Sequence, residues 1–108
     1  MRHAHPWDVS PAEAVRIQEE LRHLVQPVGD IEGVRAVAGL DVGFRSGLAR
    51  AAVVVLSYPS LEPLGEATAE CRVTFPYVPG LLSFREGPAA LAALERLTVP
   101  WDVLMCDA

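Results

Sequence analysis

The feature that most constrains the fold is a long, largely apolar stretch from Val34 to Tyr58, interrupted by the dipeptide Ser46-Gly47. Small and β-branched residues dominate both sides of this dipeptide, and they show no helical spacing. Because Ser-Gly suits a tight turn between antiparallel strands, the stretch predicts a β-hairpin. With one more strand after it, we expect an antiparallel meander within residues 34–74, with strands over 34–44, 50–58 and 66–74.

A helix is predicted before this meander, over residues 10–25. Ser10 can cap it, Pro11 suits the first helical position, and Glu13 completes a capping box. Apolar residues then recur on one helical face, which we expect to be turned to the core. They are Ala14, Ile17, Leu21 and Leu24. Residues 1–9 are expected to be a mobile or lightly docked tail, although its His3-x-His5 pair could also chelate a metal.

The last third of the chain predicts a loop, a helix and a strand. Two prolines stiffen the loop at residues 75–82. The sequence Ser83-Phe84-Arg85-Glu86 forms a second capping box, which starts a helix over residues 83–97. The final segment, 102–107, is apolar on both alternating faces, as is typical of a central parallel strand reached through a helical crossover. The chain is therefore predicted to be an α/β protein.

Composition bounds the class of protein. A chain of 108 residues that is 51% hydrophobic fits one small domain. Its longest aliphatic run is too short to cross a membrane, and no signal peptide precedes the first helix, so we expect a cytoplasmic protein. Cys71 and Cys106 lack metal-ligand spacing and are expected to be buried, reduced thiols. The net charge of -5 counts against a nucleic-acid partner, unless carboxylates are gathered around metal ions.

Asp41 is the first anomaly, because it places a carboxylate inside an apolar strand. Alternation puts it on the strand face shared by Val37 and Gly39, where either a metal cation or an arginine could compensate its charge. If the fourth strand lies parallel to the first, Asp41 and Asp107 meet near the carboxyl ends of adjacent strands. Two acids so placed repel each other unless a cation bridges them.

Glu86 supplies a third carboxylate, on the first turn of the crossover helix, where it could point at the other two. The capping box alone would equally explain a glutamate at this position. Three converging carboxylates favour Mg²⁺ or Mn²⁺. A site of this kind is suited to phosphodiester hydrolysis, in which metal ions activate water and stabilise developing charge.

Three segments resemble successive motifs of the endonuclease V family. They are Val37-Ala38-Gly39-Leu40-Asp41, the block from Thr74 to Pro88, and Val103-Leu104-Met105-Cys106-Asp107. The resemblance implies a ribonuclease H-like fold and a DNA repair enzyme that depends on magnesium, with manganese as a substitute. It also implies cleavage of a DNA strand at the second phosphodiester bond 3′ to deoxyinosine, with RNA as an open alternative. Asp41, Glu86 and Asp107 match the family's metal-binding, catalytic carboxylates.

The loop matches further family positions. The resemblance implies that Pro76, Tyr77, Val78 and Pro79 form a wedge that separates DNA strands at a lesion, and that Gly80 and Leu82 lie near the base pocket. A proline-braced loop can hold an aromatic ring against unstacked bases. Without the resemblance, Tyr77 would be read as a loop aromatic folded onto the core. For Arg85, phosphate binding, an ion pair and a solvated helix face stay open.

The chain also departs from the family. Family members continue past the third carboxylate with further strands and helices and with a catalytic lysine, whereas this chain has no lysine and carries Ala108 where glycine is common. We therefore expect residues 1–108 to be a single incomplete ribonuclease H-like domain, the N-terminal half of the fold, and inactive alone. Its open sheet edge would favour self-association. The alternative is a catalytically inert DNA-binding or self-associating fragment.

Overall fold

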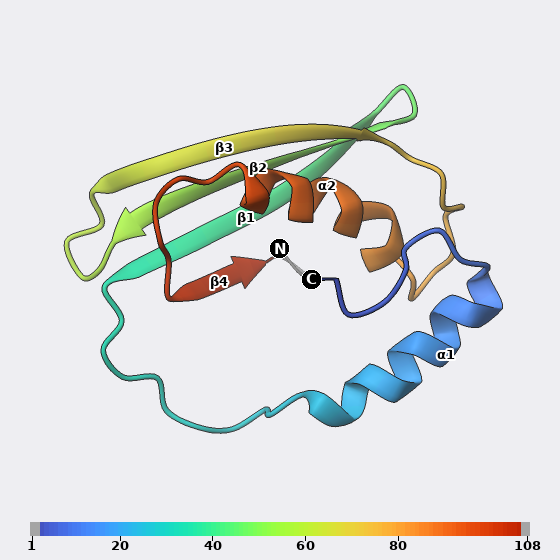
Figure 1. Ribbon diagram of the computed structural model, residues 1–108, viewed down its shortest axis with the longest axis horizontal. Coiled ribbons are helices and arrows are strands. Elements are labelled where there is room, and N and C mark those ends of the chain that lie inside the picture. The colour runs from blue at the N-terminus through green and yellow to red at the C-terminus, as the bar shows by residue number, and fades with distance from the viewer. Residues whose placement is uncertain (1–2, 107–108) are drawn as a thin grey trace.

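The computed structural model describes residues 3–106 and contains one four-stranded sheet with two α-helices (Figure 1). Along the sheet the strand order is β3-β2-β1-β4, with β4 parallel to β1 and the other neighbours antiparallel. The elements are α1 (Pro11–Leu21), η1 (Arg22–Leu24), β1 (Ala36–Arg45), β2 (Leu48–Ser57), β3 (Pro63–Arg72), α2 (Ser83–Glu95) and β4 (Val103–Cys106). The expected fold class, a meander followed by a crossover helix and a parallel strand, is confirmed.

The β1–β2 hairpin turns at Ser46 and Gly47, as predicted. Both residues adopt positive φ angles, 51° and 78°, which are the backbone angles of the two-residue turn that matches strand twist. The pairing continues up to the turn itself, since Arg45 is the partner of Leu48. At the turn, both strands therefore extend further than the predicted ranges of 34–44 and 50–58.

Helix α2 covers one face of the sheet, and small side chains make the contact close. Alternate residues of β1 and β2 point to this face and are buried, while alanines of α2 meet them. The buried cluster comprises Ala36, Ala38, Ala49, Ala51, Val53, Val55, Ala69, Ala89, Ala93 and Leu94. Burial of these apolar groups is the main stabilising term for the sheet and helix pair.

Helix α1 belongs to a second apolar cluster, beside the sheet and not on it. Its Ala14 and Ile17 are buried against Phe75, Leu81 and Phe84. The Ser10 cap is confirmed, because its hydroxyl accepts the backbone N–H of Glu13 at 3.2 Å. The inward face is shorter than predicted: α1 ends at Leu21, and Leu24 is 75% exposed. The apolar period continues at Leu24, but the α-helix gives way there to a 3₁₀ turn.

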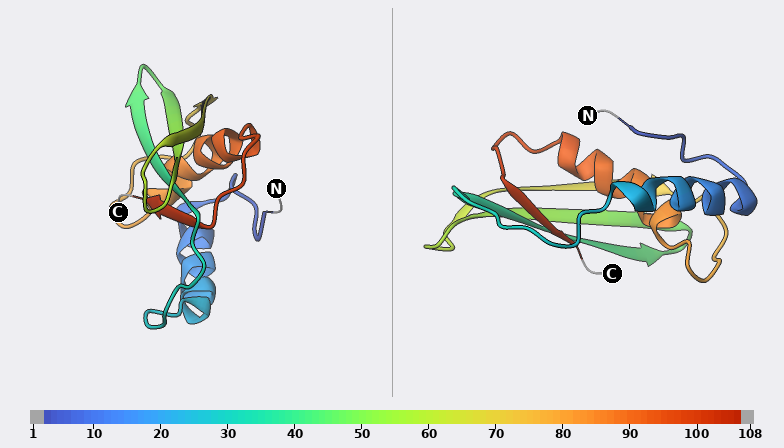
Figure 2. Two further views of the ribbon diagram at one scale, coloured as in Figure 1. Left: turned by 90° about the vertical axis from the view of Figure 1, so that its left-hand side faces the viewer. Right: turned by 90° about the horizontal axis from the view of Figure 1, so that it is seen from below.

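The opposite face of the sheet carries no helix among the described residues, because α2 packs on the other face and α1 lies beside the sheet (Figure 2). An apolar groove of about 320 Å³ crosses this face. It is lined by Val37, Gly39, Val54, Leu56, Tyr58, Leu61 and Met105. Val54 (39%) and Met105 (64%) are exposed on this face, which leaves an apolar surface open to solvent.

Asp102 connects the start of β4 to the start of β1 through hydrogen bonds. Its Oδ2 accepts the backbone N–H groups of Arg35 and Ala36 at 2.9 and 3.0 Å, and its own N–H donates to the Ala36 carbonyl at 3.0 Å. These two backbone hydrogen bonds hold the pKa of the Asp102 carboxyl below its usual value. Asp102 therefore helps to set the register on which the site depends.

Candidate active site

The register of β1 and β4 brings the site residues to one end of the sheet. Pairing runs from Val37 with Val103 to Leu40 with Cys106. Asp41 is thus the first β1 residue past the last parallel pair, beside the carboxyl end of β4. Strand β1 itself continues beyond Asp41 to Arg45, paired with β2. Asp107 follows Cys106 in the sequence but lies outside the described residues.

Asp41 is exposed, so the prediction that a buried charge must be compensated is wrong. The reason is that β4 ends before it and that its face of the sheet is open. Oδ1 of Asp41 accepts the N–H of Val42 at 3.0 Å, and within residues 3–106 no arginine forms an ion pair with it. The carboxylate is oriented by its own backbone and stays accessible to a ligand.

Glu86 does not form the predicted capping box. The N-cap residue of α2 is Leu82, without a side-chain cap, and the N–H of Glu86 already donates to the Leu82 carbonyl at 3.1 Å. Ser83 is therefore inside the helix and cannot cap it. A capping box therefore does not account for a glutamate at this position.

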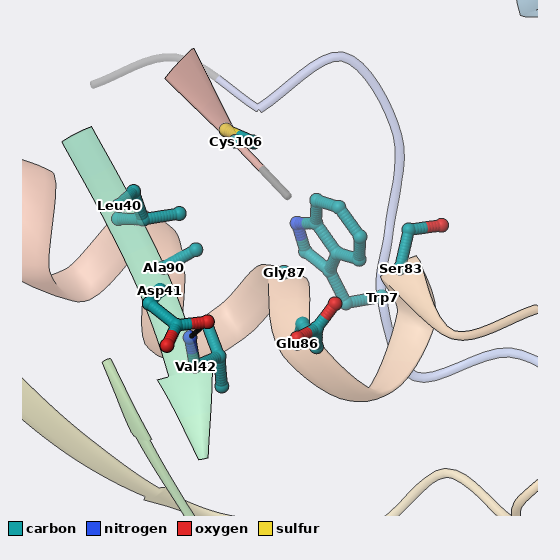
Figure 3. A pocket seen from close by; sticks show the side chains of 9 residues that line it. All are labelled: Trp7, Leu40, Asp41, Val42, Ser83, Glu86, Gly87, Ala90 and Cys106. Atoms are coloured by element: carbon teal, nitrogen blue, oxygen red, sulfur yellow. Dashed lines mark hydrogen bonds between the residues drawn. The ribbon is translucent and has the colours of Figure 1, made fainter. Parts of the chain in front are cut away.

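Asp41 and Glu86 border one pocket of about 210 Å³, the first from β1 and the second from the first turn of α2 (Figure 3). The lining residues are Trp7, Leu40, Asp41, Val42, Ser83, Glu86, Gly87, Ala90 and Cys106. Partial burial, and then the negative charge of Glu86, raise the pKa of the Cys106 thiol. Cys71 and Cys106 are free, but Cys106 is exposed and Cys71 only half-buried, which corrects the expectation of buried thiols.

The donor chemistry of this pocket fits a hard divalent cation. Two carboxylates on separate elements offer the oxygen ligands that Mg²⁺ and Mn²⁺ prefer. No group of three His, Cys, Asp or Glu side chains with metal-binding geometry occurs within residues 3–106. A complete ligand set would thus need a group beyond the two described carboxylates, such as Asp107 or water.

Sequence reasoning missed Trp7, which forms one wall of the pocket. The segment expected to be a mobile or lightly docked tail lies against α2, with the indole in contact with His5 and Phe84 at centroid distances of 4.4 and 5.6 Å. The two histidines contact Trp7 instead of forming a metal-binding pair: its Nε1 donates to Nδ1 of His3 at 2.9 Å. The only sequence signal was an aromatic residue just before a strongly capped helix.

The loop at residues 75–82 is anchored at its base and exposed at its tip. Phe75 and Leu81 are buried, and the Gly80 carbonyl accepts a hydrogen bond from Nε2 of Gln18 on α1 at 3.1 Å. Tyr77, in contrast, is 71% exposed and does not fold onto the core. Of the other predicted contact residues, Pro76, Pro79, Gly80 and Leu82 are exposed and Val78 is half-buried.

Arg85 connects this loop to the hairpin. Its guanidinium lies over the rings of Phe44 and Tyr77, 5.2 and 5.8 Å from their centroids, and Nη1 donates to the Phe75 carbonyl at 3.4 Å. Cation–π contacts of this kind contribute roughly 0.5–1 kcal/mol at exposed sites. This contact gives Arg85 a role that the sequence did not indicate, namely support of the Tyr77 ring.

The fold and pocket define an α/β domain that presents one carboxylate on β1, just past its pairing with β4, and a second on the first turn of the crossover helix α2. A family model described as Endonuclease V matches residues 19–108. The chain therefore belongs to the endonuclease V family.

Individual relatives agree with this assignment. The curated endonuclease V of Roseiflexus castenholzii is 50% identical over 103 residues, which cover 95% of this chain and 46% of that protein. A crystal structure of endonuclease V from Streptomyces avermitilis is 42% identical with a TM-score of 0.85, over 94% of this chain and 46% of the other. An endonuclease V from Ciona intestinalis, 28% identical with a TM-score of 0.75, covers 90% of this chain and 45% of its own, and is in complex with DNA containing an inosine.

The chain spans about half the length of the curated relatives it matches. No helix in the described part of the chain is long and apolar enough to cross a membrane.

Proposed function

We propose that this chain provides the carboxylate half of a DNA repair endonuclease that cleaves at the second phosphodiester bond 3′ to deoxyinosine. The observation that carries the proposal is the shared pocket of Asp41 and Glu86, in a chain of the endonuclease V family. Asp41, Glu86 and Asp107 are the proposed catalytic ligands for Mg²⁺, with Mn²⁺ as a substitute. A cytoplasmic location is part of the proposal.

The carboxylates have a clear task in this chemistry. A bound divalent cation would supply an activated water and would stabilise charge on the attacking and leaving oxygens. Asp41 and Glu86, together with Asp107, would hold this cation at their shared pocket, where a strand of nucleic acid could reach it. Asp41 is exposed and Glu86 half-buried, which supports a site that a polymeric substrate could reach.

The exposed loop tip is the proposed contact to the lesion. Tyr77 would stack on unpaired bases and separate the strands. Pro76 and Pro79 would stiffen the loop around it, and Val78 would contact the DNA next to it. Gly80, with φ of 86°, and Leu82 would border the extruded base. A deaminated base pair is already weakened, so that extrusion requires less free energy than in intact DNA.

DNA that contains deoxyinosine is the proposed partner, and RNA is a second polymer to be tested. The Ciona intestinalis relative is in complex with DNA containing an inosine, which supports this choice. The acidic net charge of this chain does not favour binding by bulk electrostatics. We therefore assign recognition to the loop and the metal pocket.

A nicking assay tests the proposal. The substrates are a duplex with one deoxyinosine, the same duplex with deoxyguanosine, and a matched RNA with inosine, each with and without Mg²⁺. The proteins are the 108-residue chain and a chimera that continues it with the remaining part of the Roseiflexus castenholzii relative. The chimera should nick the deoxyinosine strand at the second phosphodiester bond on its 3′ side, only with Mg²⁺, and the chain alone should be inactive. A chimera that folds but leaves this strand intact contradicts the proposal.

A second candidate function is supported by the bare face of the sheet. Its groove is lined by apolar side chains and one glycine, and exposed apolar surfaces of this kind mark association sites. In this alternative the chain is catalytically inert and self-associates or binds DNA as a fragment. Sedimentation of the chain at increasing concentration, with and without DNA, separates the two functions: concentration-dependent dimers without nicking by the chimera favour the alternative.

A further inference from the structure

The indole of Trp7 occupies the place where residue 87 would carry a side chain. A Cβ built on Gly87 would overlap the six-membered ring of the indole, at Cζ3 and Cη2. Gly87 has no left-handed backbone angle that would require glycine. The glycine at this helical position is therefore explained by the tryptophan that lies on it.

Trp7 is held from several sides. Its ring contacts Phe84, one turn earlier on α2, and His5 on its own segment. Nε1 donates to Nδ1 of His3, so that Nδ1 must be unprotonated and the proton of a neutral His3 is on Nε2, 3.5 Å from Oε1 of Glu95. The N-terminal segment thus follows α2 from its first turn to its last residue.

The first turn of α2 is intrinsically weak. Its N-cap, Leu82, provides no side-chain hydrogen bond, and a helix without a good cap is less stable. Gly87 weakens the helix further, because glycine has a lower helix propensity than alanine. Pro88 follows directly inside the helix and lacks an N–H to donate. A helix that begins in this way depends on outside contacts to fix its first turn, and Trp7 is the aromatic ring placed there.

Glu86 lies on this same turn and immediately precedes Gly87. Trp7 and Glu86 line the same pocket (Figure 3). We propose that Trp7 is a positioning residue, which fixes the first turn of α2 and thereby holds the Glu86 carboxylate opposite Asp41. This role rests on the proposed function, because Glu86 is positioned for the metal that the proposal assigns to the pocket.

Metal affinity tests this role without DNA cleavage. Free Mn²⁺ is measured by electron paramagnetic resonance during titration of the 108-residue chain, at a temperature where circular dichroism shows each variant folded. Trp7→Ala should weaken Mn²⁺ binding about tenfold, which is typical when a group that orients a ligand is lost. Trp7→Phe retains a ring on Gly87 and should bind Mn²⁺ with nearly the affinity of the unsubstituted chain. It is the variant to measure if Trp7→Ala fails to fold.

Gly87→Ala provides the reciprocal change. The new methyl group should displace the indole and weaken Mn²⁺ binding to the same extent as Trp7→Ala. Because both substitutions break one contact, the double variant should bind about tenfold more weakly than the unsubstituted chain, not a hundredfold. Trp101→Ala is the matched control: Trp101 packs against the main core and does not line the pocket, so its loss should lower stability and leave Mn²⁺ affinity unchanged.

The outcomes separate the two claims. If the unsubstituted chain binds Mn²⁺ and Trp7→Ala binds it equally well, the positioning role is overturned while the metal pocket stands. If Trp101→Ala weakens binding as much as Trp7→Ala, the effect is one of general stability and the positioning role is again overturned. If the unsubstituted chain does not bind Mn²⁺, the metal site of the proposed function fails and the role of Trp7 falls with it.

Discussion

Asp41 and Glu86 border the same pocket, although one lies within strand β1, just past its pairing with β4, and the other on the first turn of helix α2. Two features of the fold bring them together. The parallel pairing of β4 with β1 stops just before Asp41, and α2 crosses the sheet with its N-terminal turn at that end. The positions of the two carboxylates therefore depend on the register of the strands and on the packing of α2 against the sheet. Both can be tested separately from activity.

Asp102 should make stability depend on pH. Its folded-state pKa is lowered by hydrogen bonds from the N–H groups of Arg35 and Ala36. The stabilisation is therefore present above the usual pKa of an aspartate, about 3.9, and is lost as the pH falls through the lower folded-state pKa. Urea denaturation from pH 7 to pH 2 should show that Asp102→Asn is less stable at neutral pH, and that the difference from the unsubstituted chain shrinks below about pH 4. A difference that stays constant over this range would contradict the account.

Gly47 should tolerate no side chain without loss of stability. It has φ of 78°, and an L-residue in the left-handed region costs about 1–2 kcal/mol. Gly47→Ala should therefore lower the free energy of unfolding by about that amount. Gly43→Ala is the matched control in the same hairpin, since Gly43 has no positive φ and a Cβ there meets nothing within 4 Å. Equal effects at both positions would contradict the turn geometry.

Much of the fold could be predicted because its determinants are local. Alternation and the Ser46-Gly47 turn specify the hairpin, and the Ser10 cap specifies the start of α1. The second capping box failed because Ser83 is drawn into the helix, where the chain leaving the anchored loop is already helical at Leu82. The sequence matched the capping-box motif, but the conformation of the loop before it determined where the helix begins.

The site could be predicted only in part for a similar reason. The position of Asp41 past the last β1–β4 pair follows from strand order, whereas its exposure depends on what covers the neighbouring face. Trp7 left no periodic signal, because its contact is with a glycine far along the chain. Long-range contacts of single aromatic residues are not encoded in local spacing.

Arg85 should restrain the ring of Tyr77. Its guanidinium lies over that ring and over Phe44, so that Arg85→Ala removes a contact on each. We expect faster motion of the Tyr77 ring in the variant, seen as lower carbon order parameters by nuclear magnetic resonance. Arg72→Ala, an exposed arginine at the end of β3, is the control and should leave these order parameters unchanged. Unaltered Tyr77 motion in Arg85→Ala would remove the support assigned to Arg85.

The bare sheet face should drive any self-association of the chain. Val54→Lys places a charge in the middle of the apolar groove and should shift the sedimentation equilibrium toward monomer, because burial of an unpaired charge is unfavourable. Val15→Lys is the control, since Val15 is also an exposed valine (44%) but lies on α1. If both variants associate as strongly as the unsubstituted chain, association uses another surface, such as the outer edge of β4.

The most direct test of the metal pocket is the nicking rate of the chimera on deoxyinosine DNA with Asp41→Asn and with Glu86→Gln, each nearly the same size as the residue it replaces. Asp30→Asn, an exposed aspartate in the loop before β1, is the matched control. Each pocket variant should lose at least about a hundredfold in rate while its melting temperature is retained, because a metal ligand contributes more than the groups that merely orient one, and Asp30→Asn should be unaffected. Nicking by Asp41→Asn or Glu86→Gln at the rate of the unsubstituted chimera would contradict the account.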